Sequence, residues 1–201
     1  MKETSLNAAL DSMKIEAKAV SDILDYFDKD SFAQAVEYLK NAGHICTCAS
    51  GSSGIAAKKF AHTLCCIEQS AQFLPPSEAV HGGMGALKKG DVLVMISRGG
   101  KTDELIPIAQ VCNKKGAILI TITENEDSIL AQLADVVLPM KIERESDKYN
   151  VQATASFVMT IALCDALICA LIEETGYTKE MFGLIHPGGA VGKRLNGGEN
   201  G

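Results

Sequence analysis

Short apolar runs alternate with segments of helical period along almost the whole chain, and this alternation constrains the fold more than any other feature. The runs expected to form strands are residues 44–48, 71–74, 91–97, 117–123 and 136–139. Helices are expected between them and at both ends, over residues 5–26, 31–42, 53–68, 103–115, 127–134 and 154–175. This order predicts an α/β fold, a three-layer sandwich in which a parallel sheet of about five strands carries helices on both faces.

The length of the chain suits one domain. Its 201 residues, 47% of them hydrophobic, are enough to bury a sizeable core. We expect a single domain over residues 1–195 that begins with a helical segment, and a polar, glycine-rich tail at 196–201 that is disordered. The apolar runs are shorter than a bilayer span and the N-terminus is not signal-like, which predicts a cytoplasmic protein that does not contact a membrane.

Charge and cysteine content exclude several classes of function. A formal net charge of −6 and a pI near 5.2 leave no basic patch, so nucleic-acid binding is disfavoured. The seven cysteines show no CxxC and no metal-type spacing, and most of them lie in apolar segments. We therefore expect reduced thiols in the core.

Two of the predicted strands lead into similar loops, CASGSSG at residues 48–54 and SRGGKTDE at residues 97–104. Ligands of parallel α/β sheets bind at the carboxyl ends of the strands, where helix N-termini present free N–H groups. Glycines allow a close approach and hydroxyl groups can hold an anion, although Ser, Thr and Asp before a helix are also ordinary caps. Neither loop matches a Walker or dinucleotide motif, so a small phosphorylated ligand is favoured over a nucleotide.

Glu104 ends the second loop and is expected in the first turn of the following helix. A carboxylate at that place complements the helix dipole. Beside a bound phosphosugar, it could also remove a proton from the carbon next to a carbonyl group. The residue is therefore a candidate general base.

Both loops resemble those of the sugar isomerase (SIS) domain family, in its arabinose-5-phosphate isomerase branch. The similarity extends to SEAVHGGMGAL at 77–87, to the helix that ends in CDALICAL at 164–171, and to HPGGAVGKRL at 186–195. It implies interconversion of D-ribulose 5-phosphate and D-arabinose 5-phosphate, the first step towards the lipopolysaccharide and capsule sugar Kdo. It implies no cofactor and no metal, and the two histidines and carboxylate lack i, i+4 spacing. Many members carry two C-terminal CBS domains, and a form without them is expected here.

The resemblance also implies roles for individual residues. Glu104 falls at the position of the acid–base carboxylate, and His81 and His186 fall at those of two catalytic histidines. The implied phosphate and sugar contacts are Ser50, Ser52, Ser53, Ser97, Arg98, Gly99, Thr102, Thr154 and Ser156. A homo-oligomer is implied as well, expected to be a tetramer with shared active sites, in which His186 enters the site of a neighbouring subunit.

The chain departs from the family pattern at several of these positions. Ser52 stands where the first loop of the family has a lysine that is thought to assist catalysis. Lys58 and Lys59 lie one to two turns further on, and a different helix placement would be needed for either to substitute. Gly99 replaces a hydroxyl residue and Arg98 replaces an asparagine. Two alternatives therefore remain open: a non-catalytic phosphosugar-binding SIS regulator, and an isomerase of another sugar phosphate.

Overall fold

The structure, a computed structural model, describes residues 1–195 and contains one five-stranded sheet of order β2–β1–β3–β4–β5. All neighbouring strands in it are parallel. The strands are β1 (Ile45–Cys48), β2 (Ala71–Phe73), β3 (Val92–Ile96), β4 (Ile118–Thr123) and β5 (Val136–Pro139). Each lies within a predicted apolar run, so the α/β fold is confirmed. The expected disordered tail, 196–201, lies outside the described residues.

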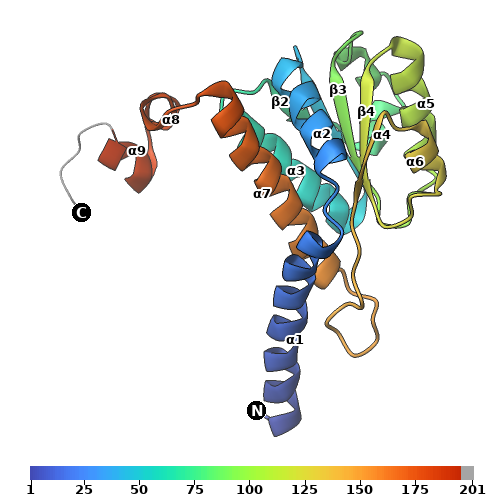
Figure 1. Cartoon of the computed structure of the whole chain (residues 1–201), viewed down its shortest axis with the longest axis vertical. Coiled ribbons are helices and arrows are strands. Elements are labelled where there is room, and N and C mark those ends of the chain that lie inside the picture. Colours follow the sequence, from blue (N-terminus) through green and yellow to red (C-terminus); the bar gives the residue numbers. More distant parts are fainter. Residues whose placement is uncertain (196–201) are drawn as a thin grey trace.

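Helices connect the strands and extend beyond the sheet at both ends of the described chain (Figure 1). They are α1 (Glu3–Asp22), α2 (Lys29–Asn41), α3 (Gly51–Cys65), α4 (Pro76–Ala79), α5 (Ile106–Lys115), α6 (Ile129–Leu133), α7 (Ala155–Thr175), α8 (Lys179–Ile185) and α9 (Gly189–Leu195), with 3-10 turns η1 (Ile23–Asp25) and η2 (Gly83–Ala86). The six predicted helices correspond to α1, α2, α3, α5, α6 and α7. The short helices α4, α8 and α9 were not predicted.

A hydrophobic cluster lies on each face of the sheet. Successive side chains of a strand point to opposite faces, so Val92 and Val94 join one cluster while Leu93 and Met95 join the other. The helices α2, α3 and α7 cover the first face, and α5 and α6 cover the second (Figure 1). Because both faces are covered, β1 and β3 are buried along their whole length.

Local sequence signals set several helix ends. The Asp28 carboxylate caps α2 by accepting hydrogen bonds from the backbone N–H groups of Asp30 and Ser31. Helices α5 and α7 end at Gly116 and Gly176, which adopt left-handed φ angles of 69° and 66°. Glycine adopts this conformation without a steric penalty, which explains these two helix ends.

Helix α7 is long and apolar enough to cross a membrane by length and composition. Half of its most apolar window is buried inside the chain, where the helix packs against α1, α2 and α3. Burial of this kind is typical of the core helix of a globular protein.

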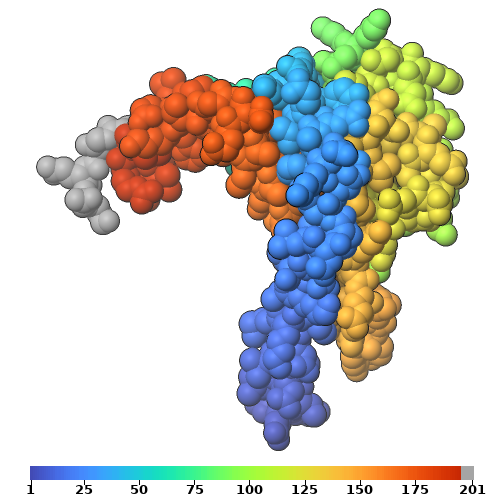
Figure 2. Space-filling view, in the orientation of Figure 1, coloured from blue at the N-terminus to red at the C-terminus, as the bar shows by residue number. Residues whose placement is uncertain are grey.

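Two parts of the described chain stand away from the sheet. The N-terminal half of α1 and the segment α8–α9 project in different directions (Figures 1 and 2). The loop 141–154 lies beside α1, and the Ser12 hydroxyl donates a hydrogen bond of 2.8 Å to the Ser146 hydroxyl. These projections leave apolar side chains of α1 and α8 exposed to solvent.

The expectation that the cysteine thiols lie in the core holds for some of the seven cysteines. Cys48, Cys112 and Cys164 are buried, and burial raises the pKa of each to about 12. Cys65 and Cys169 are exposed, contrary to the expectation. Cys169 lies on the side of α7 that turns away from its buried residues.

Candidate functional site

The two predicted loops meet at the carboxyl edge of the sheet, because β1 and β3 are neighbours and run parallel. Ser50 is the residue before α3, and its hydroxyl donates a hydrogen bond of 2.6 Å to Oε2 of Glu104. Glu104 lies in a turn that precedes α5, which begins at Ile106 rather than at the predicted residue 103. A candidate base and a hydroxyl from separate loops are thus in direct contact.

A cavity of about 510 Å³ opens at this edge, a volume within the range of small-molecule sites. Its polar side chains are Ser50, Ser77, Lys58 and Glu104, and the two charged ones are of opposite sign. The rest of the wall is Ala49, Gly51, Gly54, Ile55, Phe73, Pro75, Pro76, Val80 and Pro107. The cavity therefore combines an apolar wall with a carboxylate, an ammonium group and hydroxyls.

One face of α3 forms a wall of this cavity. Gly51, Gly54, Ile55 and Lys58 all line it, and their i, i+3, i+4, i+7 spacing places them along one side of a helix. Ser52 is exposed and lies outside this lining set. The first loop therefore contributes Ser50 to the cavity directly, and the wall continues along the helix to Lys58.

The sequence-based expectation is that Lys58 or Lys59 could substitute for the family lysine only with a different helix placement. Helix α3 begins at Gly51, two residues before its predicted start at 53, and Lys58 lies on the cavity side. Its Nζ atom lies 5.0 Å from the centre of the Phe73 ring, within the range of a cation–π contact. Lys59 instead forms an ion pair with Asp165 of α7.

The second loop brings two of its predicted hydroxyl residues together. The hydroxyl oxygens of Ser97 and Thr102 lie 2.9 Å apart. Gly100 allows the turn between them, because its φ is 62° and its N–H donates to the carbonyl oxygen of Ser97. Gly99 is exposed at the tip of the same turn. Neither hydroxyl lines the 510 Å³ cavity, to which this loop contributes Glu104.

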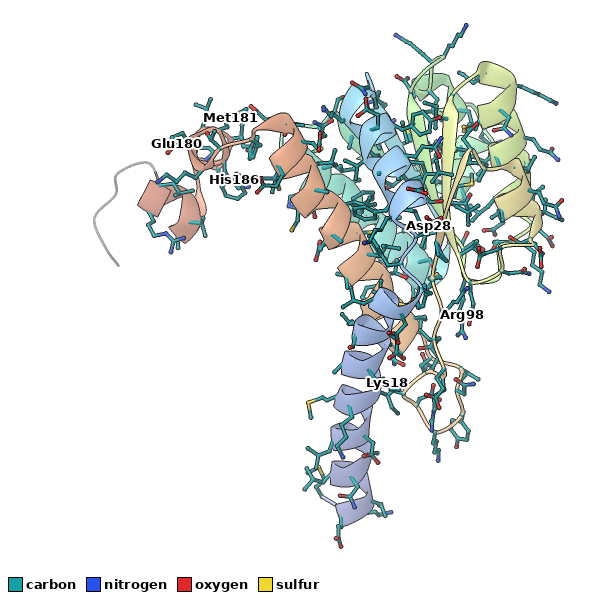
Figure 3. The ribbon with its side chains drawn as sticks, in the orientation of Figure 1. Lys18, Asp28, Arg98, Glu180, Met181 and His186 are labelled. Atoms are coloured by element: carbon teal, nitrogen blue, oxygen red, sulfur yellow. The ribbon has the colours of Figure 1, made fainter. Side chains whose placement is uncertain are left out.

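Arg98 extends from this loop towards two carboxylates. Its Nε donates to Glu124 at 2.6 Å and a terminal nitrogen donates to Glu145 at 2.9 Å. Figure 3 shows the side chain at the lower edge of the sheet, towards the loop 141–154. The structure therefore places this guanidinium in ion pairs rather than in the cavity lining.

Glu145 is buried, with a side-chain exposure of 3%, and it gathers the remaining predicted hydroxyl residues. Thr154 donates to it through its N–H and hydroxyl at 2.9 and 3.0 Å, and Ser156 donates through the same two groups. Burial acts to raise the pKa of Glu145, but the bonds from Ser156 and Thr154 lower it below its ordinary value. These hydroxyls face Glu145 instead of the cavity. Sequence reasoning missed this network, because an acidic residue in a polar segment shows no signal of burial.

The two candidate histidines lie in different places. His81 is exposed in the turn after α4, between Val80, which lines the cavity, and Gly82. His186 directly follows α8, and its ring stacks on Phe182 at 3.7 Å. Figure 3 shows His186 on the projecting C-terminal segment and Arg98 at the far edge of the sheet. A single chain therefore brings Ser50 and Glu104 together but does not bring His186 to them.

Comparison with known proteins adds three kinds of similarity. The model of the SIS domain family matches residues 38–170. Arabinose 5-phosphate isomerase KdsD of Pseudomonas aeruginosa is 36% identical over 191 residues, or 94% of this chain, and arabinose 5-phosphate isomerase KpsF of Escherichia coli is 32% identical over 90% of it. The chain spans 58% and 55% of the lengths of these curated relatives.

Solved structures share the fold. A Listeria monocytogenes protein superposes with a TM-score of 0.90 at 41% identity, covering 94% of this chain and 100% of that chain. The E. coli CFT073 protein c3406 in complex with arabinose 5-phosphate superposes with a TM-score of 0.86 at 31% identity, covering 93% of this chain and 100% of that one.

Proposed function

The chain belongs to the SIS domain family, and we propose that it is an aldose–ketose isomerase that interconverts D-ribulose 5-phosphate and D-arabinose 5-phosphate. The names of its relatives and the sugar phosphate complex of c3406 support this substrate. The observation that carries the proposal is the contact between Ser50 and Glu104 in a cavity at the carboxyl edge of the sheet. We infer a cytoplasmic catalyst whose arabinose 5-phosphate supplies the synthesis of Kdo for lipopolysaccharide or capsule.

Glu104 is the base in this mechanism. With the open-chain aldose bound, its carboxylate removes the proton from C2, and the electrons of that bond form a double bond between C1 and C2. The carbonyl electrons move to O1, which gives a cis-enediolate. Glu104 then returns the proton to C1 and the C2 carbonyl forms, which yields the ketose. The hydrogen bond from Ser50 fixes the carboxylate on the cavity side of its turn.

The neighbouring loop holds the phosphate group. Ser97 and Thr102 present converging hydroxyls, the backbone of Gly99 lies in the turn between them, and Ser53 lies in the first turn of α3 on the neighbouring connection. Hydroxyl and N–H donors at such a loop bind a phosphate dianion without a formal positive charge. Arg98 keeps the loop in place through its ion pairs with the carboxylates of Glu124 and Glu145.

The histidines move the proton between O1 and O2 in this proposal. His81 flanks the cavity of its own chain, whereas His186 comes from a neighbouring subunit of a tetramer. The projecting segment that carries His186 supports this exchange, as do the exposed apolar residues of α1, which recur at i, i+4 and i+7. These residues are Leu6, Leu10 and Met13, which are 46%, 44% and 60% exposed. A second copy of the chain would cover both surfaces.

The test is formation of ribulose 5-phosphate from D-arabinose 5-phosphate by EDTA-treated protein, with Glu104→Gln as the matched variant. Gln keeps the size of the side chain and removes its ability to take a proton, so we expect a loss of turnover on the order of 1000-fold. Binding, followed as a shift of the thermal midpoint with arabinose 5-phosphate, should persist in the variant.

Two other outcomes would redirect the assignment. A wild-type chain that is stabilised by arabinose 5-phosphate but does not turn it over is a phosphosugar-binding regulator. A chain that neither binds nor converts this sugar, yet isomerises a hexulose or heptulose phosphate, is an isomerase of a different substrate. The replacement of the family lysine by Ser52 makes the regulator the main competing assignment.

A further inference from the structure

We propose that Lys58 supplies the positive charge that stabilises the enediolate in this cavity. The inference rests on the proposed function, because it assigns a role within the same isomerisation. Lys58 and Glu104 are the charged side chains among the described residues that line the cavity. A base and a cation in one cavity match the needs of a reaction that removes a proton and creates an oxyanion.

The geometry of α3 directs Lys58 to this task. Lys58 follows Gly51 by seven residues, so it lies on the cavity side about 10 Å further along the helix. Side chains of an α-helix tilt towards its N-terminus. The long stem of the lysine therefore leans back towards the carboxyl edge of the sheet, where Ser50 and Glu104 are in contact.

The charge of Lys58 is also available to a ligand. Within residues 1–195 it takes part in none of the salt bridges, whereas the adjacent Lys59 is paired with Asp165. The ring of Phe73 faces the Lys58 ammonium at 5.0 Å and holds it at the cavity wall without neutralising it.

The position of Lys58 assigns it to the reacting carbons rather than to the phosphate. Ser97 and Thr102, the hydroxyl pair of the phosphate loop, lie outside the cavity lining, while Glu104 lies within it. When Glu104 takes the proton from C2, the electron pair of the C1 carbonyl moves to O1. The Lys58 ammonium compensates the negative charge that forms there, and the charge disappears again when the ketose carbonyl forms at C2.

The experiment compares steady-state kinetics of the wild type, Lys58→Gln, Lys58→Arg and Lys59→Gln with D-arabinose 5-phosphate. Loss of one oxyanion-stabilising group lowers kcat by roughly 100- to 1000-fold. Because Lys58 is open to solvent, we expect the lower end, about 100-fold for Lys58→Gln, with KM changed less than about threefold. Lys58→Arg should regain part of the loss, and Lys59→Gln should match the wild type.

Each alternative result has a distinct meaning. A fall in affinity with kcat unchanged overturns the inference, because Lys58 would then bind the substrate and its transition state equally well. If Lys58→Gln is as active as an active wild type, the role of Lys58 is overturned but the proposed function is not. A wild type without turnover overturns the proposed function and the role of Lys58 with it.

Discussion

Replacing Glu145 by Gln should destabilise the fold by about 3 kcal/mol, because the buried carboxylate accepts from several donors at once. Its Oε1 accepts from Arg98 and Ser156, and its Oε2 accepts from both polar groups of Thr154 and from the Ser156 N–H. An amide keeps one oxygen and turns an NH2 group towards the remaining donors. With the oxygen at the Thr154 side, the Ser156 hydroxyl can reverse its bond, but the Arg98 guanidinium cannot.

The fall in the free energy of unfolding therefore has two parts. The charge-assisted hydrogen bond from Arg98 contributes roughly 1.5–3 kcal/mol, and the weaker bonds from Thr154 and Ser156 contribute the rest. Urea unfolding at pH 7 measures it directly, and the thermal midpoint should fall by about 6–12 °C in a chain of this length. Glu143→Gln is the matched control. That carboxylate is largely exposed and lies 3.9 Å from Lys18, so its removal should change the free energy of unfolding by less than about 0.5 kcal/mol.

The pH dependence provides a second check on Glu145. Its pKa is lowered in the folded chain, so its contribution to stability is complete above about pH 4.5 and is lost as the pH falls through the lower folded pKa. The difference between the wild type and Glu145→Gln should therefore shrink below about pH 4. The reasoning would be refuted if Glu145→Gln lowered the free energy of unfolding by less than about 1 kcal/mol at pH 7. It would also be refuted if the difference in unfolding free energy between the two proteins stayed constant down to about pH 3.

Two further predictions concern the loop and the assembly. Gly100→Ala should lower the free energy of unfolding, measured in urea, by on the order of 3 kcal/mol. The φ of Gly100 is 62°, and a new Cβ there would lie 1.9 Å from the Ser128 hydroxyl. The control Gly99→Ala meets nothing closer than 3.9 Å and should leave the stability nearly unchanged. Mixing inactive Glu104→Gln and His186→Ala chains should restore up to about a quarter of wild-type turnover if sites are shared, whereas a mixture as inactive as its components contradicts sharing.

The strands were predictable because buried parallel strands are short continuous apolar runs, and the observed strands lie inside the predicted ones. The contact of Ser50 with Glu104 also follows from topology, since their loops leave adjacent parallel strands. The helices α4, α8 and α9 have only four to seven residues. A helix of one or two turns repeats its apolar positions few times, so its period is a weak signal; α6, of five residues, was predicted as part of the longer segment 127–134.

The features of the site that the sequence did not predict depend on contacts between residues far apart in the chain. Arg98 and Glu145 are 47 positions apart in the sequence. The family resemblance therefore could not show that the Arg98 guanidinium pairs with the Glu145 carboxylate. Lys58 lines the cavity while the adjacent Lys59 is paired with Asp165, because successive residues of a helix are turned by about 100°. Helix boundaries are difficult to place to within one or two residues, and α3 begins two residues before its predicted start.

The ion pairs of Arg98 also affect how a ligand arrives. One guanidinium between Glu124 and Glu145 leaves this side of the loop with a surplus negative charge, on a chain whose formal net charge is −6. The proposed substrate, a sugar phosphate dianion, is therefore not drawn in from a distance by the field of the protein. Beyond a Debye length of about 8 Å in physiological salt, diffusion alone delivers it. Capture then depends on short-range donors, and raising the ionic strength should not slow the encounter.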